Sequence, residues 1–245
     1  MTTHAMEDNA AAPRTGESLA GLDLFALGRL ATAARERQVA RRGSFARTRQ
    51  LLADGSWRGP RDAAEAYIDE ADLAAVGGIT VARGEGVSAL VAARDLALVA
   101  AAHEAGLRVS WRVSFREGES DATRLEHLAA LEPMAARLSV LVPTPVGEAY
   151  GLDGLRCFAL CRLALPGVPH VAADAAALGP RLAQMAFGFG ADELWAPIVA
   201  ERALRIGANA GNPALTRKEA ATLIRGAGLI ACERLADGTL EEVTS

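Results

Sequence analysis

The sequence predicts an α/β protein: a shortened or partial (β/α) barrel of the TIM type, with parallel strands and outer helices. Short β-like runs alternate with helical segments from residue 76 onward, in units of roughly 30 residues, which favours parallel strands joined by crossover helices. About five or six such units are visible, fewer than the eight of a closed TIM barrel. The 245 residues, 51% of them hydrophobic, provide enough chain for a core of this size.

The part before these units is predicted to be mainly helical. Residues 21–38 have the apolar spacing of an amphipathic helix. Residues 44–53 are compatible with a continuation of that helix, which Asp54 and Gly55 would end. Pro60 is suited to the first turn of a further helix over residues 60–73.

The alternating part is delimited by helix and strand signals. Gly106 ends one helix, Pro143 closes one strand, and Thr216 with Glu219 three residues later has the spacing of a capping box. Residues 192–196 form a short segment between two helices. The predicted strands are 76–82, 107–115, 137–142, 168–173 and 229–235, and the predicted helices are 88–104, 120–130, 149–165, 174–187, one beginning at Pro197, and 213–227.

Composition excludes several classes of protein. The net charge of −4 gives no field that would attract nucleic acid or an anionic membrane. An odd count of three cysteines argues against a disulfide scaffold and fits a reducing compartment. Residues 1–18 lack the features of a signal peptide, and residues 90–102 are too short and too charged to span a bilayer. We therefore expect a cytoplasmic protein with a disordered leader, 1–18, and one domain, 19–245.

Several blocks of sequence in the same order carry a family resemblance. They are Leu24-Phe25-x-Leu27-Gly28-Arg29-Leu30-Ala31, Ala102-His103-Glu104-Ala105-Gly106-Leu107, Leu141-Val142-Pro143, Pro169-His170-Val171, Phe189-Gly190-Ala191-Asp192-Glu193-Leu194, and Leu215-Thr216-Arg217-Lys218-Glu219. Together these blocks resemble the radical SAM enzymes of the futalosine route to menaquinone, of the aminofutalosine synthase and dehypoxanthine futalosine cyclase type. The resemblance implies shared ancestry and a similar barrel.

The sequence also departs from that family. Its enzymes hold a 4Fe–4S cluster with Cys-x-x-x-Cys-x-x-Cys after the first strand, and the cluster binds S-adenosylmethionine (SAM). Here no cysteine follows Arg49 until Cys157. Residues 115–119 lack the histidine of the family's Gly-His-x-Glu, and residues 195–197 replace its Asp-Gly-Thr. We therefore expect no cofactor and no metal site in this chain.

The cysteines allow two interpretations. Cys157 and Cys161 share one face of a predicted helix, where free cysteines commonly behave as small buried hydrophobes. Iron or zinc ligation would require Cys232, about seventy residues later, or His170 to join them. A structural role is favoured.

Five residues are candidate ligand contacts. Arg112 shares a strand face with Ser110 and Ser114, so it points either into the barrel or toward an exposed edge. Arg116 and Glu117 follow the same strand, whereas Asp192 and Glu193 form an acidic turn that would bind a polar group or cap the helix at Pro197. We name no catalytic residue.

A stretch of arginines at residues 35–49 is a further candidate. It would bind a phosphate or the acidic face of a partner, or it forms a solvated helix face. The absence of interleaved aromatic residues argues against nucleic acid.

The resemblance and the departures together suggest a pseudoenzyme, a cluster-less relative of aminofutalosine synthase. It would act as an accessory, partner or metabolite-binding protein in menaquinone synthesis, with a futalosine-pathway enzyme or a small metabolite as its partner. Two alternatives stay open. One is an active futalosine-pathway enzyme whose cluster comes from elsewhere, or whose carboxylates Glu117, Glu119, Asp192 and Glu193 supply acid–base chemistry. The other is a diverged remnant with a purely structural role.

Overall fold

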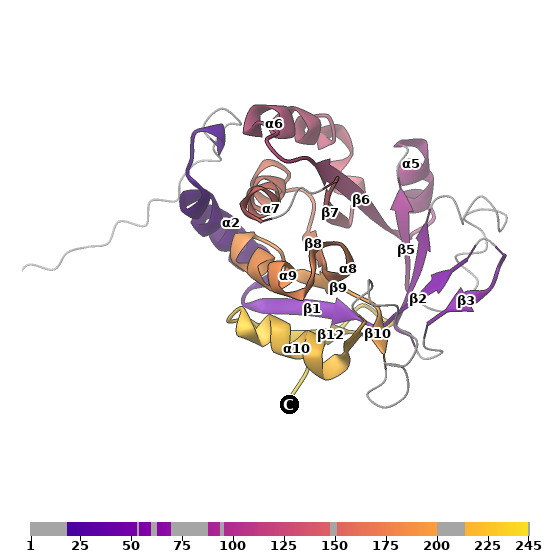
Figure 1. Cartoon of the computed structure of the whole chain (residues 1–245). Helices are drawn as coiled ribbons and strands as arrows, with labels where there is room; N and C mark the ends of the chain where they lie inside the picture. Colours follow the sequence, from indigo (N-terminus) through magenta and orange to yellow (C-terminus); the bar gives the residue numbers. More distant parts are fainter. Residues whose placement is uncertain are drawn as a thin grey trace, which may run out of the picture.

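The structure, a computed structural model, describes residues 19–52, 54–59, 63–69, 88–93, 96–147, 151–199 and 214–244 (Figure 1). Eleven strands form one sheet in the order β13-β12-β1-β9-β8-β7-β6-β5-β4-β2-β3. They are β1 (Arg42–Ala46), β2 (Thr48–Leu51), β3 (Trp57–Arg58), β4 (Glu65–Asp69), β5 (Ser88–Ala93), β6 (Arg108–Phe115), β7 (Val140–Pro145), β8 (His170–Asp174), β9 (Glu193–Trp195), β12 (Ile230–Arg234) and β13 (Leu240–Glu242). All pairings are parallel except those of the edge strands β3 and β13.

The helices follow the strands in the alternation that the sequence predicts. They are α2 (Leu24–Val39), α5 (Leu96–Glu104), α6 (Asp121–Ala129), α7 (Leu152–Ala164), α8 (Ala175–Leu178), α9 (Pro180–Ala186) and α10 (Arg217–Gly226), with 3-10 turns η2 (Glu132–Arg137) and η3 (Phe187–Phe189). A small separate pair joins β10 (Ile198–Val199) and β11 (Leu215–Thr216). The α/β class with a largely parallel sheet is thereby confirmed.

The sheet is strongly curved. β1 and β2 are consecutive pieces of chain, separated by Arg47 alone. β1 pairs with β9, however, while β2 pairs with β4, and β8, β7, β6 and β5 lie between those two partners. The run of strands therefore bends round until both of its ends meet the same stretch of chain, 42–51, in the manner of a TIM-like barrel.

The two faces of the curved sheet have different chemistry. Leu141 and Val171 belong to the main core that includes residues of α2, α7 and α9, so their face is the outer, helix-covered one. Their neighbours Val140, Val142 and Ala172 form a second, small apolar cluster with Tyr67 and Trp195. Because side chains alternate along a strand, this second cluster marks the inner, concave face.

Local capping explains where two of the helices begin. The Asp23 carboxylate accepts a hydrogen bond from Ala26 N at 2.9 Å at the start of α2. Thr216 and Glu219 form the capping box that their spacing predicts at the start of α10. α2 packs against α7, and α10 packs against β12 and α9 (Figure 1).

The predicted helical continuation over residues 44–53 is wrong. This stretch forms β1 and β2, and four of the five residues of β1 are buried. β1 lies between two parallel partners, and a short apolar run buried on both faces carries no strand periodicity. Tertiary pairing therefore overrides the local helical pattern here. Gly43 suits this central position, because a Cβ there would lie 2.7 Å from Ile224.

Two further predicted helices contain strands. β4 occupies most of the described part of 60–73, and β5 begins the predicted helix 88–104, of whose described residues Leu96–Glu104 are helical. The alanine- and leucine-rich run of β5 fits a buried parallel strand as well as a helix, so its pattern alone does not decide. The predicted strand 76–82 and the leader 1–18 lie outside the described residues.

The late helices also differ from the prediction. The helix expected over 174–187 is divided into α8 and α9 by Gly179, whose φ is 78°, and by Pro180, which cannot continue a helix. Pro197 begins no helix within the described residues, because Ile198 and Val199 form strand β10. Among the described helices, none is both long and apolar enough to cross a membrane.

Candidate functional site

The inner face carries polar side chains toward the carboxyl ends of its strands. We call Tyr67, Arg112, Thr144 and Asp174 the strand-end cluster. They come from β4, β6, β7 and β8, and the register places Arg112 opposite Val142, on the inner face. The predicted alternation of β6 is confirmed, since Val113 and Phe115 belong to the helix-covered core on the other face. Of the two orientations left open for Arg112, the structure shows the inward one.

Arg112 is the centre of the strand-end cluster. Its Nη1 lies 3.3 Å from Thr144 Oγ1 and 3.5 Å from Asp174 Oδ2, and its Nη2 lies 3.5 Å from Tyr67 Oη. The Thr144 hydroxyl donates to Val142 O at 3.0 Å, which leaves its oxygen to accept from Arg112. One third (33%) of the Arg112 side chain is exposed, so a molecule entering the concave face can reach the guanidinium.

A second group lies deeper on the same face. We call Glu65, Arg108, Glu193 and Arg234 the charge quartet. Arg108 bridges the two carboxylates, at 2.5 Å from Glu65 Oε1 and 3.0 Å from Glu193 Oε1. Arg234 also pairs with both, and its Nη2 lies 3.3 Å from Glu65 Oε2. Two positive and two negative groups therefore neutralise one another inside the sheet.

The charge quartet supports the strand-end cluster through Trp195. The Trp195 indole N–H donates to Glu193 Oε2 at 3.1 Å, and the ring makes an edge-to-face contact with Tyr67 at 6.1 Å between centroids. Burial opposes ionisation of Glu193, but Arg234 and Arg108 outweigh it and hold the pKa of Glu193 well below its usual range. Glu193 is therefore an ionised structural anion rather than a group that exchanges protons near neutrality.

Asp192, the other half of the predicted acidic turn, is also held inside the protein. It pairs with Arg162, accepts from Val171 N at 2.8 Å, and lies 2.6 Å from His170 Nδ1 through its second oxygen. Asp192 and Glu193 are 2% and 1% exposed. The alternative of a helix cap at Pro197 is wrong, because both carboxylates are used by buried cations and, as far as the structure describes the chain there, Pro197 is followed by strand β10.

His170 makes the stability of the protein dependent on pH. Burial opposes its protonation, but Asp192 and Glu193 outweigh burial and raise the pKa of His170 above its usual 6.5. The stabilisation from protonated His170 is complete below pH 6.5 and is lost as the pH rises through the folded-state pKa. We expect wild type to lose more stability than His170→Gln between pH 6 and pH 8.5. Urea unfolding at both pH values measures the difference, and equal losses would contradict it.

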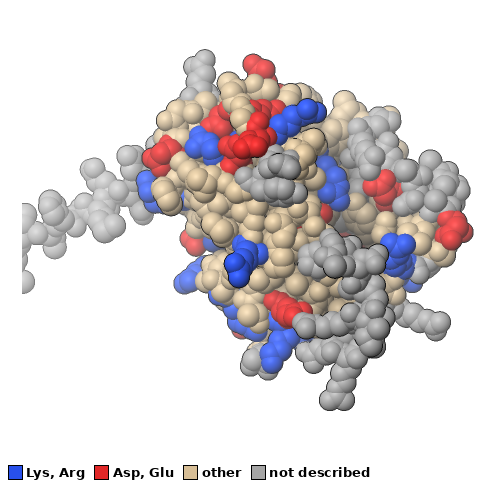
Figure 2. All heavy atoms as spheres, in the orientation of Figure 1, with Lys and Arg blue, Asp and Glu red and all other residues tan. Residues whose placement is uncertain are grey.

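Arg116 and Glu117 lie elsewhere. Both are exposed on the loop between β6 and α6. Next to this loop, Asp121 pairs with Arg124 and Arg156, and Arg156 Nε lies 3.1 Å from Asp121 Oδ2. Figure 2 shows acidic and basic side chains intermingled over the region of α6. Of the predicted ligand contacts, Arg112 thus lies in the strand-end cluster. Arg116 and Glu117 are not part of that cluster.

The arginine-rich stretch 35–49 does not form one patch. Arg35 is 3% exposed and donates to Phe187 O, Arg41 donates to Gly228 O at 3.2 Å, and Arg47 pairs with Glu233 at 2.6 Å. These side chains belong to α2, to the turn after it and to the end of β1. Arg37, Arg41 and Arg42 are exposed, as the solvated-face alternative expects, whereas Arg35 is buried, so the stretch does not form a single phosphate site.

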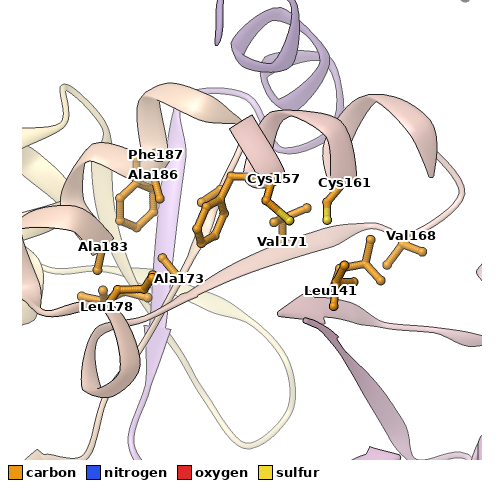
Figure 3. Close-up of a cluster of buried hydrophobic side chains, with 14 of the residues drawn as sticks. Leu141, Cys157, Cys161, Val168, Val171, Ala173, Leu178, Ala183, Ala186 and Phe187 are labelled. Carbon is orange, nitrogen blue, oxygen red and sulfur yellow. The ribbon is translucent and has the colours of Figure 1, made fainter. Parts of the chain in front are cut away.

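The three cysteines are buried structural residues. Cys157 and Cys161 lie side by side on α7 among Leu141, Val168 and Val171 (Figure 3). A hydrogen bond with Cys157 and burial raise the pKa of Cys161 well above its usual range, and burial raises the pKa of Cys232 on β12. Protonated thiols in an apolar core are poor metal ligands. Among the described residues, no three His, Cys, Asp or Glu side chains are placed to hold a metal ion.

Sequence reasoning missed most partners of Arg112. Tyr67 lies in a segment predicted as helix, and Asp174 was assigned to the start of a helix, which it does cap, without a role toward Arg112. Thr144 stands between two prolines that indicated only the end of a strand. One signal was available: the carboxyl ends of parallel strands gather polar residues at one edge of a sheet.

Comparisons with known proteins place this arrangement in context. No protein-family model matches the chain. It is 27% identical over 167 residues to 5-amino-6-(D-ribitylamino)uracil–L-tyrosine 4-hydroxyphenyl transferase 1 of Methanosarcina barkeri, covering 60% of this chain and 44% of that protein. It is 36% identical over 84 residues to aminodeoxyfutalosine synthase of Thermus thermophilus, covering 34% of this chain and 23% of that protein. The matches thus span less than half the length of these curated relatives.

Two solved structures share the fold. Methylornithine synthase superposes with a TM-score of 0.55 at 10% identity, covering 87% of this chain and 92% of that one. HydG, a maturase of the FeFe-hydrogenase, gives 0.53 at 9% identity, with coverages of 90% and 72%. These likenesses show the fold alone, which is that of radical SAM barrel proteins. The two curated relatives confirm the resemblance to the radical SAM family and to its futalosine-pathway members.

The comparisons correct one expectation. The relatives are radical SAM enzymes that use a 4Fe–4S cluster and SAM, which contradicts the expectation that this chain has no cofactor. That expectation rested on the missing cysteine motif alone. The three cysteines present do not fit such a cluster, because two lie on α7 with their side chains packed inside the core and the third lies on β12. We therefore derive no chemistry from a cluster held by these thiols.

Proposed function

We propose that this chain is a metabolite-binding accessory protein of the futalosine route to menaquinone, built on a radical SAM-type scaffold. The similarity to aminodeoxyfutalosine synthase supports the pathway. Its partner would be a small metabolite of that pathway, alone or delivered by a pathway enzyme. The strand-end cluster is the proposed binding site.

The observation that carries this proposal is the position of Arg112. A partly exposed guanidinium on the concave face of a parallel sheet, near the carboxyl ends of its strands, lies where such folds bind ligands. Its three contacts measure 3.3 to 3.5 Å, so a charged ligand can replace them with shorter bonds. Tyr67 and Trp195 add aromatic surface beside it.

The enzymatic alternative receives no support from the four carboxylates assigned to it. Asp192 and Glu193 are buried in ion pairs, and Glu117 is exposed on a loop. Glu119 accepts from Arg116 N at 3.3 Å, within its own loop. Only a group that can reach a ligand can transfer a proton to it.

Arg112→Gln tests the proposed site. We expect binding of aminodeoxyfutalosine, measured by titration calorimetry, to weaken about 10-fold or more, because a charge-assisted hydrogen bond contributes about 1.5–3 kcal/mol. Arg116→Gln is the matched control, because it removes an exposed arginine four residues along the chain and should leave the affinity unchanged. Equal affinity of wild type and Arg112→Gln, or no binding to wild type, would refute the proposal.

A further inference from the structure

We propose that α2 is a dimerisation helix, against which α2 of a second copy of this chain packs antiparallel about a two-fold axis. α2 belongs to the layer of helices outside the curved sheet, where it contacts α7 (Figure 1). The inference is therefore independent of the strand-end cluster and of the proposed function.

The first step is the shape of the surface beside α2. A groove with a volume of about 490 Å³ lies between α2 and η3, and we call it the α2 groove. Gly188 and Phe189 form its η3 side. Its α2 side is formed by residues three or four positions apart, which share one face of the helix: Phe25, Gly28, Arg29, Thr32, Ala33 and Glu36. This face is distinct from the buried one that includes Leu27 and Ala31.

The second step is that the α2 groove is already formed in the single chain. Thr32 Oγ1 donates to Gly188 O at 3.0 Å. Gly28 lets η3 come close, since a Cβ there would lie 2.9 Å from Phe189 Cε1. At one end of the groove Phe25 is 73% exposed, although it is a large apolar side chain. A preformed surface loses little conformational freedom on association, so less of the binding energy is spent on ordering it.

The third step is the charge pattern, which selects a second copy as the occupant. Arg29 and Glu36 are both exposed and lie on either side of the small residues Thr32 and Ala33. A two-fold axis between residues 32 and 33 of antiparallel helices places each Arg29 opposite the partner's Glu36, so two ion pairs form by symmetry. A parallel pair would place like charges together instead.

Neither charge is strongly engaged within its own chain. Among the described residues, Arg29 has no hydrogen-bond or ion-pair partner, and Glu36 pairs with the neighbouring Arg35 at 3.4 Å. Both side chains are therefore able to pair across the axis.

The size of the surface sets the expected affinity. α2 has 16 residues and is about 24 Å long. An interface built on this helix and η3 lies at the small end of specific interfaces, near about 1,200 Å² in total. We therefore expect a dissociation constant in the micromolar range.

Sedimentation velocity of the full-length protein tests the inference by charge exchange. Between about 1 and about 100 µM, we expect wild type to pass from monomer to dimer. Arg29→Glu and Glu36→Arg should each raise the dissociation constant at least about 10-fold, because each places like charges opposite one another. The double variant Arg29→Glu/Glu36→Arg should recover the dimer, because the ion pairs form again with their charges exchanged.

Ala33→Cys gives a second, geometric measurement. Ala33 lies beside the proposed axis, and the three native cysteines are buried. We expect Ala33→Cys to form a disulfide-linked dimer under mild oxidation, whereas Arg137→Cys, at an exposed position of η2, should stay a monomer in reducing-agent-free gels.

The controls separate this inference from folding and from the proposed function. Arg137→Glu makes the same change of charge outside the α2 groove and should leave the dissociation constant unchanged. Arg112→Gln should also dimerise like wild type, so a failure of metabolite binding leaves the dimer intact. A wild type that remains monomeric up to about 100 µM would overturn the inference. So would a dimer that ignores both charge reversals, or a double variant as weak as the single ones, since the α2 groove would then serve another occupant.

Discussion

Glu193→Ala is expected to lower the free energy of unfolding by about 3–5 kcal/mol, because removing one carboxylate from a buried ion-pair network leaves one positive charge in excess inside the protein. Arg234, 7% exposed, would keep Glu65 as its remaining carboxylate, which it would share with Arg108. The Trp195 indole N–H would lose its acceptor as well. A natural domain is typically stable by about 5–15 kcal/mol, so the loss is a large share of the total.

Urea unfolding of wild type and variant measures this effect. Glu241→Ala is the matched control, because it removes the same side chain from the exposed edge strand β13 and should change stability by less than about 0.5 kcal/mol. A Glu193→Ala protein as stable as the Glu241→Ala protein would show that the charge quartet contributes nothing to folding. The Trp195 environment should change with Glu193→Ala, and tryptophan fluorescence of the folded variant reports it.

Arg162→Met is expected to cost a similar amount, about 3–5 kcal/mol. Arg162 is 1% exposed, and its guanidinium joins segments that are distant in sequence. It donates to Gly190 O and Pro169 O, both at 2.9 Å, and it also bonds to Gln38 and Asp192. Methionine fills much of the space but leaves two carbonyls without a donor and Asp192 without its buried cation.

Arg162→Lys distinguishes loss of charge from loss of shape. A lysine keeps the charge but cannot reproduce the planar fork of donors, so we expect it to recover only part of the stability. Arg137→Met, at an exposed position, is the control and should be nearly neutral. Thermal unfolding gives the ranking, and a lysine variant as stable as wild type would show that charge alone is required.

Local patterns predicted elements whose signals lie within a few residues. The helix over 21–38, the capping box at Thr216 and the strand of Arg112 all follow from periodicity or capping chemistry. The family resemblance, which the comparisons confirm, rested on short blocks of the same kind. Patterns of this sort can be recognised from the sequence alone, because the residues that create them are neighbours in the chain.

What could not be predicted depends on residues far apart in sequence. β1 is a strand because β9 and β12 pair with it on either side, and nothing in the sequence of residues 42–46 indicates those partners. The candidate site has the same origin: Tyr67, Arg112 and Asp174 come from three strands whose register the sequence does not give. The sequence predicts that Asp192 and Glu193 bind a polar group or cap a helix, because their buried partners, Arg162 and Arg234, lie 30 and 41 residues away and are not visible from the local pattern.

Gly190 illustrates a residue whose role only the structure reveals. Its φ is 98°, and a Cβ there would lie 2.8 Å from Arg162 Cβ and 3.1 Å from Ala31 Cβ. The position therefore requires both a left-handed backbone and the absence of a side chain. The same close approach lets the Gly190 carbonyl accept the Arg162 Nε proton, which ties the turn before β9 to α7.

The stretch 42–51 also sets the order in which the chain can fold as it is synthesised. β1 leaves the ribosome early, but its two neighbours, β9 and β12, begin at Glu193 and Ile230. Until those residues emerge, β1 has no partner on either side and exposes hydrogen-bonding groups and the aromatic ring of Phe45. Because contacts so distant in sequence form slowly, the nascent protein passes through a period of vulnerability to aggregation that ends only when β9 and β12 have emerged.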